Sequence, residues 1–193
     1  MNFASTKNNK GFSLIEMLLV LGVLAVLLVA AFVVYPRVRD ASRANNEVAN
    51  LTAIKASINN LYATKGGNYN GLTTGVANQA RAFPVSMNSG TYTGEAITSS
   101  WGGGVKITPA AGTNSRTFDI EYAAVPEGVC LGLVSGAAGN FKQITVGTKK
   151  VLGVTTTTGT GPTATESTTG TVFNPADAAA ACTGTVAVKF TSD

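Results

Sequence analysis

A long apolar stretch near the N-terminus constrains this chain more than any other feature. Residues Met17 to Tyr35 are nineteen in a row without a charge. At about 1.5 Å per residue they form roughly 28 Å of helix, close to the hydrocarbon thickness of a bilayer. Glu16 stands directly before this stretch. A plain membrane anchor has no use for a carboxylate there, so an explanation of the segment has to account for Glu16 as well as for the length.

The composition limits the chemistry that is open to the chain. Its 193 residues are enough for one domain of ordinary size. Histidine is absent, which excludes His-based catalytic triads, most zinc sites and the usual proton shuttle near neutral pH. We therefore expect no enzyme, no catalytic residue, no metal site and no cofactor. The alternative, a membrane-anchored periplasmic enzyme, would have to draw on only ten acidic residues.

The basic residues give no sign of a nucleic-acid interface. The formal charge is +4, from 14 Lys and Arg against 10 Asp and Glu. Removal of Lys7 and Lys10 with a leader leaves 12 basic against 10 acidic residues, a charge of +2. Only Lys149 and Lys150 are adjacent, and no basic stripe with interleaved aromatic residues occurs. We expect no direct binding of nucleic acid.

The chain has two cysteines, Cys130 and Cys182. Without histidine or further cysteines they do not indicate a metal site. Two buried free thiols are one interpretation. A Cys130–Cys182 disulfide is the other, and export to an oxidising compartment favours it.

Two common explanations of the N-terminal segment fit poorly. A cleaved secretory signal has a shorter apolar core and a small-x-small site after it, whereas Tyr35 and Pro36 follow the core here. A plain transmembrane anchor fits the length but explains neither Glu16 nor the Gly11-Phe12 pair before it.

The string KGFSLIE, Lys10 to Glu16, explains the whole segment. With the apolar run behind it, this string resembles the class III signal of type IV prepilins. The resemblance implies that an inner-membrane peptidase cuts between Gly11 and Phe12 and methylates the new amine of Phe12. The apolar segment would then stay in the mature protein.

The resemblance also implies a role for Glu16. It would attract the Phe12 ammonium of a neighbouring subunit during assembly. In a low dielectric such a pair is worth far more than in water, and each charge offsets the desolvation of the other. The local alternative is that Glu16 only favours the N-terminus of its own helix or pairs with its own Phe12.

The helix is predicted to continue well beyond the apolar stretch. Apolar residues recur at steps of three and four, which is typical of an amphipathic helix, at Val38, Ala41, Ala44, Val48, Leu51, Ile54, Ile58 and Leu61. Gly66 and Gly67 are expected to end a helix that runs from Phe12 to Lys65. Pro36 is expected to kink it, and Gly22 is a second weak point.

The rest of the chain predicts a sheet with short helices. The clearest strand is Thr117–Val125, where Phe118, Ile120 and Tyr122 alternate with acidic residues. Further strands are predicted at 105–107, 143–146, 149–154 and 185–190, with a hairpin turn at Gly147-Thr148. Short helices are predicted at 127–138 and, behind an Asn174 cap, at 176–182.

Two glycine- and threonine-rich segments are predicted to be irregular. Trp101 to Gly104 lacks the Lys-Ser/Thr of a phosphate loop, so we interpret it as a turn. Thr155 to Thr171 holds ten threonines in seventeen residues. It is interpreted as a solvated loop, with surface variation or glycosylation as the functional alternative.

These patterns predict an α+β protein in which a long N-terminal helix packs on an antiparallel sheet. The resemblance implies that this is the type IV pilin fold, with a C-terminal region bounded by a Cys130–Cys182 disulfide. The expected organisation is a cleaved leader at 1–11, a transmembrane and polymerisation helix at 12–36, and an amphipathic helix with a globular head at 37–193.

The resemblance implies a polymer subunit. The C-terminal half of the chain, with ACTGTVAVKF near its end, is similar to the type IVb group, which includes toxin-coregulated and conjugative thin-pilus pilins. The eleven-residue leader and a first mature Phe look like type IVa. The implied function is that of the major structural subunit of a type IV pilus, which serves adhesion, aggregation or conjugation. A minor pilin and a type II secretion pseudopilin are the alternatives.

The implied partners are other copies of the chain, the inner membrane, the prepilin peptidase and the pilus assembly machinery. The implied location is the inner membrane of a Gram-negative bacterium for the precursor and an extracellular pilus for the mature subunit.

Overall fold

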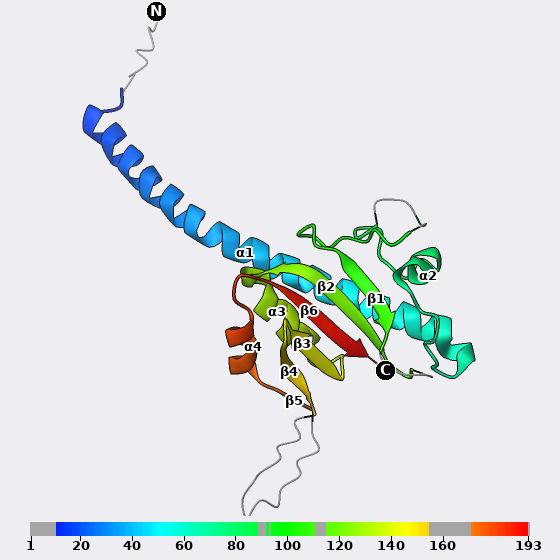
Figure 1. The fold of residues 1–193 in the computed structure, drawn as a ribbon. Coiled ribbons are helices and arrows are strands. Elements are labelled where there is room, and N and C mark those ends of the chain that lie inside the picture. The colour runs from blue at the N-terminus through cyan, green and yellow to red at the C-terminus, as the bar shows by residue number, and fades with distance from the viewer. Residues whose placement is uncertain (1–10, 89–91, 93, 111–114, 155–170, 193) are drawn as a thin grey trace, which may run out of the picture. The chain divides into compact units, whose positions relative to one another are not determined.

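The chain forms two compact units, which are described separately. The computed structural model describes residues 11–88, 92, 94–110, 115–154 and 171–192. One unit ends at Arg39 and the other, which we call the head, begins at Asp40. Helix α1, Leu14–Tyr62, contributes its first part to the N-terminal unit and its second part to the head (Figure 1).

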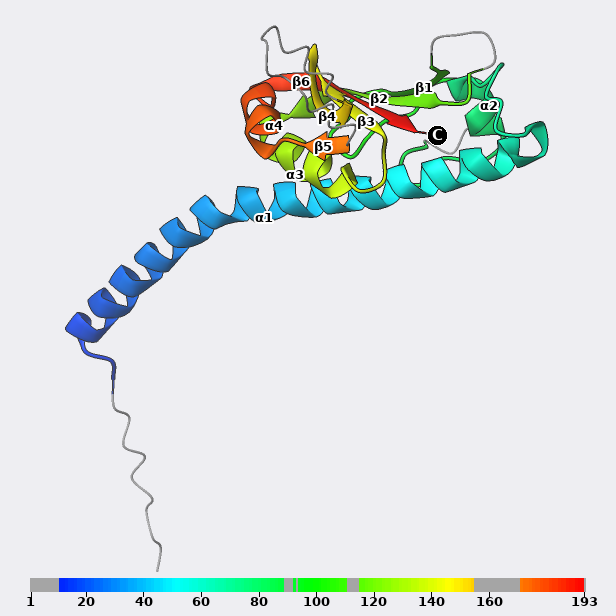
Figure 2. The same ribbon diagram turned by 90° about the horizontal axis from the view of Figure 1, so that it is seen from below.

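The second part of α1 supplies one side of the core of the head. Its fully buried residues follow one another at steps of three and four, and they are Ala44, Glu47, Leu51, Ile54, Ile58 and Tyr62. Figure 2 shows this part of the helix running along one face of the sheet. The apolar spacing thus predicted the buried face, but Leu61 is exposed and Val48 only half-buried, because Glu47 and Tyr62 take the buried positions.

The helix ends close to the predicted glycines. The α-helix stops at Tyr62, and Ala63–Lys65 form one 3-10 turn, so the predicted helical end at Lys65 is wrong for the α-helix by three residues. Gly66 follows with φ 63°, a left-handed conformation that glycine adopts without steric strain. At the other end α1 begins at Leu14 rather than at Phe12.

The head contains one six-stranded antiparallel sheet. The strands lie in the order β1-β2-β6-β3-β4-β5. Their bounds are Val105–Pro109 for β1, Phe118–Pro126 for β2, Gln143–Val146 for β3, Lys149–Val154 for β4, Thr171–Phe173 for β5 and Thr185–Ser192 for β6. The alternation in β2 buries Phe118, Ile120 and Tyr122 against α1, as predicted, and Gly147 turns the β3–β4 hairpin.

A bulge interrupts the pairing of β2 with β6 between Tyr122 and Val125. Ala124 within it has φ 53°, which is uncommon for alanine. The turn at Trp101–Gly104 packs against this bulge, because the indole N–H of Trp101 donates to the Ala123 carbonyl at 3.2 Å. A Cβ on Gly103 would lie 1.9 Å from that same carbonyl oxygen, so the close approach requires glycine there.

Helix α3, Glu127–Ala137, packs very closely on α1. A Cβ at Gly128, Gly132 or Gly136 would lie within 3.0 Å of a side chain on α1. Those side chains are Asp40, Ala44 and Val48, one turn apart on α1. The G-x-x-x-G-x-x-x-G spacing therefore lets the two helical backbones come together.

Helix α4, Pro175–Ala181, starts behind the predicted cap: the Asn174 side chain accepts from the amides of Ala176 and Asp177. Pro175 is the first helical residue, as the Asn174-Pro175 pair predicted, and the helix ends at Ala181, one residue earlier than predicted. Cys182 follows it and forms a disulfide with Cys130 of α3, which is one of the two alternatives that the sequence left open.

Two short elements were not predicted, namely β5 and helix α2, Thr74–Gln79. Residues 155–170 of the threonine-rich segment and residues 1–10 of the predicted leader lie outside the described residues. Thr171 belongs to β5 and not to a loop.

Candidate functional site

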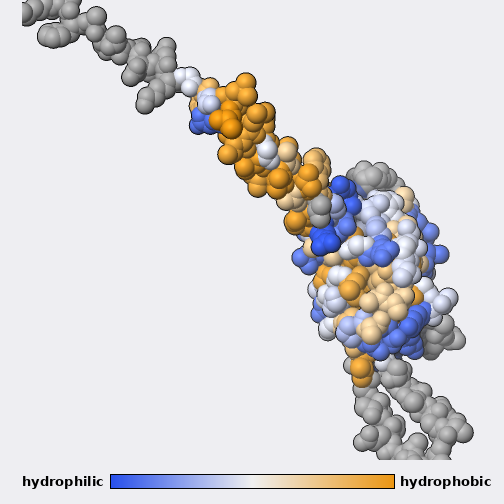
Figure 3. Space-filling view, turned by 90° about the vertical axis from the view of Figure 1, so that its left-hand side faces the viewer, coloured by the Kyte–Doolittle hydropathy of each residue, from blue (hydrophilic) through white to orange (hydrophobic). Residues whose placement is uncertain are grey.

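The first part of α1 exposes apolar side chains along its length. Phe12, Leu14 and Ile15 are about three-quarters exposed, and large apolar residues remain exposed as far as Val38. Figure 3 shows this surface as a continuous hydrophobic stretch. By length and composition, α1 is the only helix among the described residues that is long and apolar enough to cross a membrane. A helix that is apolar all round needs lipid or other helices around it.

Glu16 lies in the first turn of α1. The turn is held by the Ser13 carbonyl, which accepts from the amides of Glu16 and Met17 at 3.0 and 3.2 Å. The side chain is exposed and makes no ion pair within the described part of the chain. Its carboxylate is therefore available to a partner outside this chain, and it also suits the positive end of its own helix.

The fold itself does not require glycine at Gly11 or Gly22. Apart from its chain neighbours and nearby helix backbone, a Cβ at either position would meet no atom of the described residues within 4 Å, and neither residue has a left-handed backbone. In a helix interior glycine is less favourable than alanine by about 1 kcal/mol, so Gly22 weakens α1. Pro36 lies inside α1 and lacks the N–H that a regular helix would donate. The kinks expected at these residues stay predictions.

Among the described residues of the head, one carboxylate is buried that was not predicted, that of Glu47, with 1% of its surface exposed. Its Oε1 accepts from the Ser100 amide at 2.7 Å. Its Oε2 accepts from the Tyr122 hydroxyl and the Asn50 amide, both at 3.3 Å. Burial, and then the neighbouring Glu47 carboxylate, raise the pKa of Tyr122 well above its ordinary value, which keeps the phenol a donor. Glu47 thereby joins α1, the Trp101 turn and β2.

Replacing Glu47 by alanine should lower the free energy of unfolding of the head by about 3 kcal/mol. The change leaves the Ser100 and Tyr122 donors without an acceptor and opens a cavity. Glu47→Gln should lower the free energy of unfolding by less, because the amide oxygen of glutamine can still accept a hydrogen bond. Thermal unfolding of the detergent-solubilised chain, followed by the near-ultraviolet circular dichroism of Trp101 and Tyr122, measures both.

The matched control is Glu95→Ala, which removes an exposed carboxylate and should change stability by less than about 0.5 kcal/mol. Equal unfolding temperatures for Glu47→Ala and Glu95→Ala would contradict the structural role of Glu47.

Within the described ranges, no group of three or more His, Cys, Asp or Glu side chains converges as metal ligands do. The structure places the predicted site residues in two different parts of the chain. It does not bring the predicted residues together: Gly11, Phe12 and Glu16 lie in the N-terminal unit, and the disulfide lies in the head.

Comparison with known proteins agrees with this division. Residues 6–32 match the prokaryotic N-terminal methylation motif. Residues 41–193 match the family described as PilS N terminal.

Among curated relatives, the major structural subunit of bundle-forming pilus from Escherichia coli O127:H6 (strain E2348/69 / EPEC) is 26% identical over 180 residues, which cover 93% of this chain and 90% of the relative. The protein of the same description from Escherichia coli O111:H- is 26% identical over 182 residues.

Two solved structures are similar, each with a TM-score of 0.49. The type IVb pilin from Salmonella typhi is 21% identical, with 76% of this chain and 97% of that chain covered. TcpA, a type IV pilin from Vibrio cholerae El Tor biotype, is 17% identical, with 80% and 99% covered. The two family matches confirm the resemblance noted in the sequence: the chain belongs to the PilS N terminal family and carries the prokaryotic N-terminal methylation motif.

Proposed function

We propose that this chain is the structural subunit of a type IV pilus and polymerises through the first part of α1 into a surface filament. The observation that carries the proposal is the apolar surface from Phe12 to Val38, which nothing in the described chain covers. Both curated relatives are major structural subunits of a pilus, which favours a major over a minor subunit for this chain. Adhesion, aggregation and conjugation are the uses that we propose for the filament.

The same surface suits two successive environments. Leu14 to Tyr35 is roughly 33 Å of helix, enough to span the hydrocarbon core of a bilayer. The precursor would lie in the inner membrane of a Gram-negative cell, and the assembly machinery would transfer the helix from lipid to a bundle of like helices. Both environments bury the apolar side chains, so the exchange need not expose them to water.

Processing would occur between Gly11 and Phe12, with methylation of the new Phe12 amine by the prepilin peptidase. Gly11 precedes α1, is exposed, and has open space around the position of a Cβ. The fold of the chain therefore gives no reason for glycine there. A peptidase that must approach the Gly11-Phe12 peptide bond closely does give a reason for glycine, because glycine has no side chain in the way.

Gly11→Leu should leave a precursor that is eleven residues too long, because the bulky side chain blocks the approach of the peptidase. The length is measured by mass spectrometry of the membrane-bound chain. Gly139→Leu is the matched control, since Gly139 also has open space and no left-handed backbone, and that chain should be cut normally. Normal cleavage of the Gly11→Leu chain would refute this processing site.

For Glu16 we propose a pair with the Phe12 ammonium of the neighbouring copy. The exposed position of Glu16 in the first turn and its lack of an ion pair in the described chain support the proposal. Within an apolar bundle each charge would offset the desolvation of the other.

Shearing filaments from the surface of the native host tests the proposed function. Electron microscopy should show filaments, and peptides of this head should dominate the digest of the purified material. A minor pilin would be substoichiometric, and a pseudopilin would stay at the envelope. Filaments that lack this chain, or its absence from sheared material, would overturn the proposal.

A further inference from the structure

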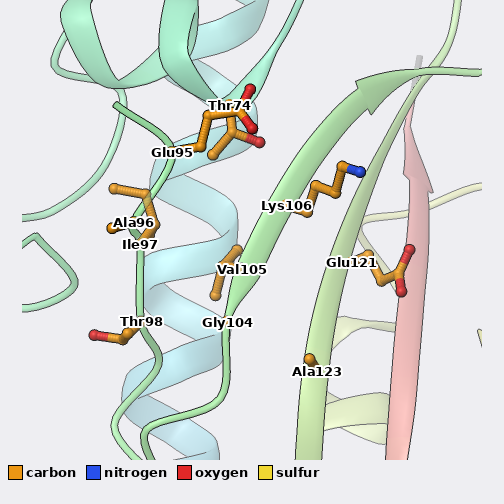
Figure 4. A pocket seen from close by; sticks show the side chains of 10 residues that line it. All are labelled: Thr74, Glu95, Ala96, Ile97, Thr98, Gly104, Val105, Lys106, Glu121 and Ala123. Carbon is orange, nitrogen blue, oxygen red and sulfur yellow. The ribbon is translucent and has the colours of Figure 1, made fainter. Parts of the chain in front are cut away.

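A groove of about 420 Å³ lies beside β1, the edge strand of the sheet (Figure 4). The segment 95–98 forms one wall, and β1 and β2 form the other. Its floor is apolar, with Ala96 and Ala123 exposed and Ile97 and Val105 almost completely buried. Exposed charged side chains stand around this floor, namely Glu95, Lys106 and Glu121.

The rim of the groove carries two carboxylates, Glu95 and Glu121, against one cation, Lys106. Lys106 lies directly opposite Glu121 in the pairing of β1 with β2, so these two charges face each other across strands. Glu95 stands apart, near Thr74 in Figure 4, and makes no ion pair with any described residue. An apolar floor with an acidic rim suits a long side chain that has an aliphatic stem and a terminal cation, as lysine has.

Most cations of the head already have partners. Lys149 pairs with Asp177 at 2.8 Å, and Lys189 pairs with Asp119. Lys55 donates to the Asn140 carbonyl. Among the described residues of the head, the exposed cations that make no ion pair, hydrogen bond or ring contact are Lys106, Arg116 and Lys150.

Arg116 and Lys150 lie at different distances from the groove in the order of the strands. Lys150 lies in β4, next to the edge strand β5, whereas the groove borders β1 at the opposite edge. Arg116 precedes β2, the direct neighbour of β1. An open filament needs head-to-tail contacts, in which two different surfaces of one subunit meet on successive copies. Surfaces at opposite edges of one sheet meet this requirement, so Lys150 is the better partner for the groove.

We propose that the groove beside β1 binds Lys150 of a second copy of this chain, with its stem in the groove and its ammonium on Glu95. This contact rests on the proposed function, because it joins successive heads along the filament. The Lys149–Asp177 pair fixes the strand next to Lys150 and helps to present it.

Exchange of the two charges tests the contact. Lys150→Glu and Glu95→Lys should each lower the yield of sheared filaments at least about tenfold, because like charges then meet across the contact. The chain with both substitutions should recover to within about threefold of the unsubstituted yield. Arg116→Glu, the matched control, should leave the yield unchanged. A normal yield for either single reversal, no recovery in the double variant, or recovery of Glu95→Lys by Arg116→Glu would overturn the proposal.

A second experiment needs no substitution that threatens folding. A zero-length carbodiimide joins a carboxylate to an amine in contact, and mass spectrometry locates the new amide. Intact filaments should yield a peptide that links Glu95 to Lys150, and detergent-dispersed subunits should not. Links from Lys150 only to other carboxylates, or none in intact filaments, would refute the contact. If the native host makes no filament of this chain, the proposed function fails instead.

Discussion

Glu16→Ala is expected to abolish filaments while leaving membrane insertion and cleavage intact. The apolar stretch from Met17 remains, and the Gly11-Phe12 bond is unchanged. The head begins at Asp40 and has its own core, so it should fold normally. In the filament, however, the Phe12 ammonium would be buried without its partner. Removal of one member of a buried pair costs roughly 3–5 kcal/mol, enough to shift assembly by about two to three and a half orders of magnitude.

Counting filaments beside the cleaved subunit in membranes of the Glu16→Ala strain measures this effect. If Glu16 acts only on its own helix N-terminus, the loss is under about 1 kcal/mol and filament numbers stay near normal. Glu16→Asp is the matched control, because it keeps the charge and should retain part of the assembly. Normal numbers of filaments built from the alanine chain would exclude the intersubunit role.

Loss of the Cys130–Cys182 disulfide should lower the free energy of unfolding of the head by about 4 kcal/mol. The bridge closes a loop with a sequence separation of 52, and the chain-entropy treatment gives this value for such a loop. The bond also ties α3 to the end of α4. Cys130→Ser should therefore make the head sensitive to protease and reduce the number of pili.

Limited proteolysis of the mature chain with and without reductant measures the stabilisation by the disulfide. The control is the chain with both cysteines replaced by alanine, whose sensitivity should not depend on reductant. Alkylation of native filaments without reductant should label no thiol. Labelling of both cysteines would contradict the disulfide in the assembled protein.

The strands could be predicted because their sequence alternates clearly. Lys149–Val154 and Gln143–Val146 were placed at their observed bounds, and the polar–apolar alternation identified the buried face of β2. The Asn174 cap was visible because Asn followed by Pro marks a helix start. β5 and α2 were missed because three and six residues are too few to show a period.

The close packing of α3 on α1 could not be predicted from local patterns. The spacing of Gly128, Gly132 and Gly136 is visible in the sequence, but only the fold shows which helix they face. Glu47 did leave a signal, since it lies three residues after Ala44 and four before Leu51 on the buried face. A charged residue at such a position indicates a buried hydrogen-bonded carboxylate.

The two candidate sites differ in how far the sequence reveals them. Gly11, Phe12 and Glu16 lie close together in one motif, so their roles could be inferred without a structure. The groove beside β1 joins residues from three segments, and its proposed partner lies across the sheet. That relation depends on strand order, which no local pattern encodes.

The N-terminus of the subunit in native filaments tests the central claim most directly. Mass spectrometry of sheared, purified filaments should find this chain beginning at Phe12, with one additional methyl group on that residue. This result requires that the chain was processed, kept its apolar helix and entered the polymer. Filaments built from a chain that begins at Met1, or from one that has lost the apolar segment through Tyr35, would contradict the account.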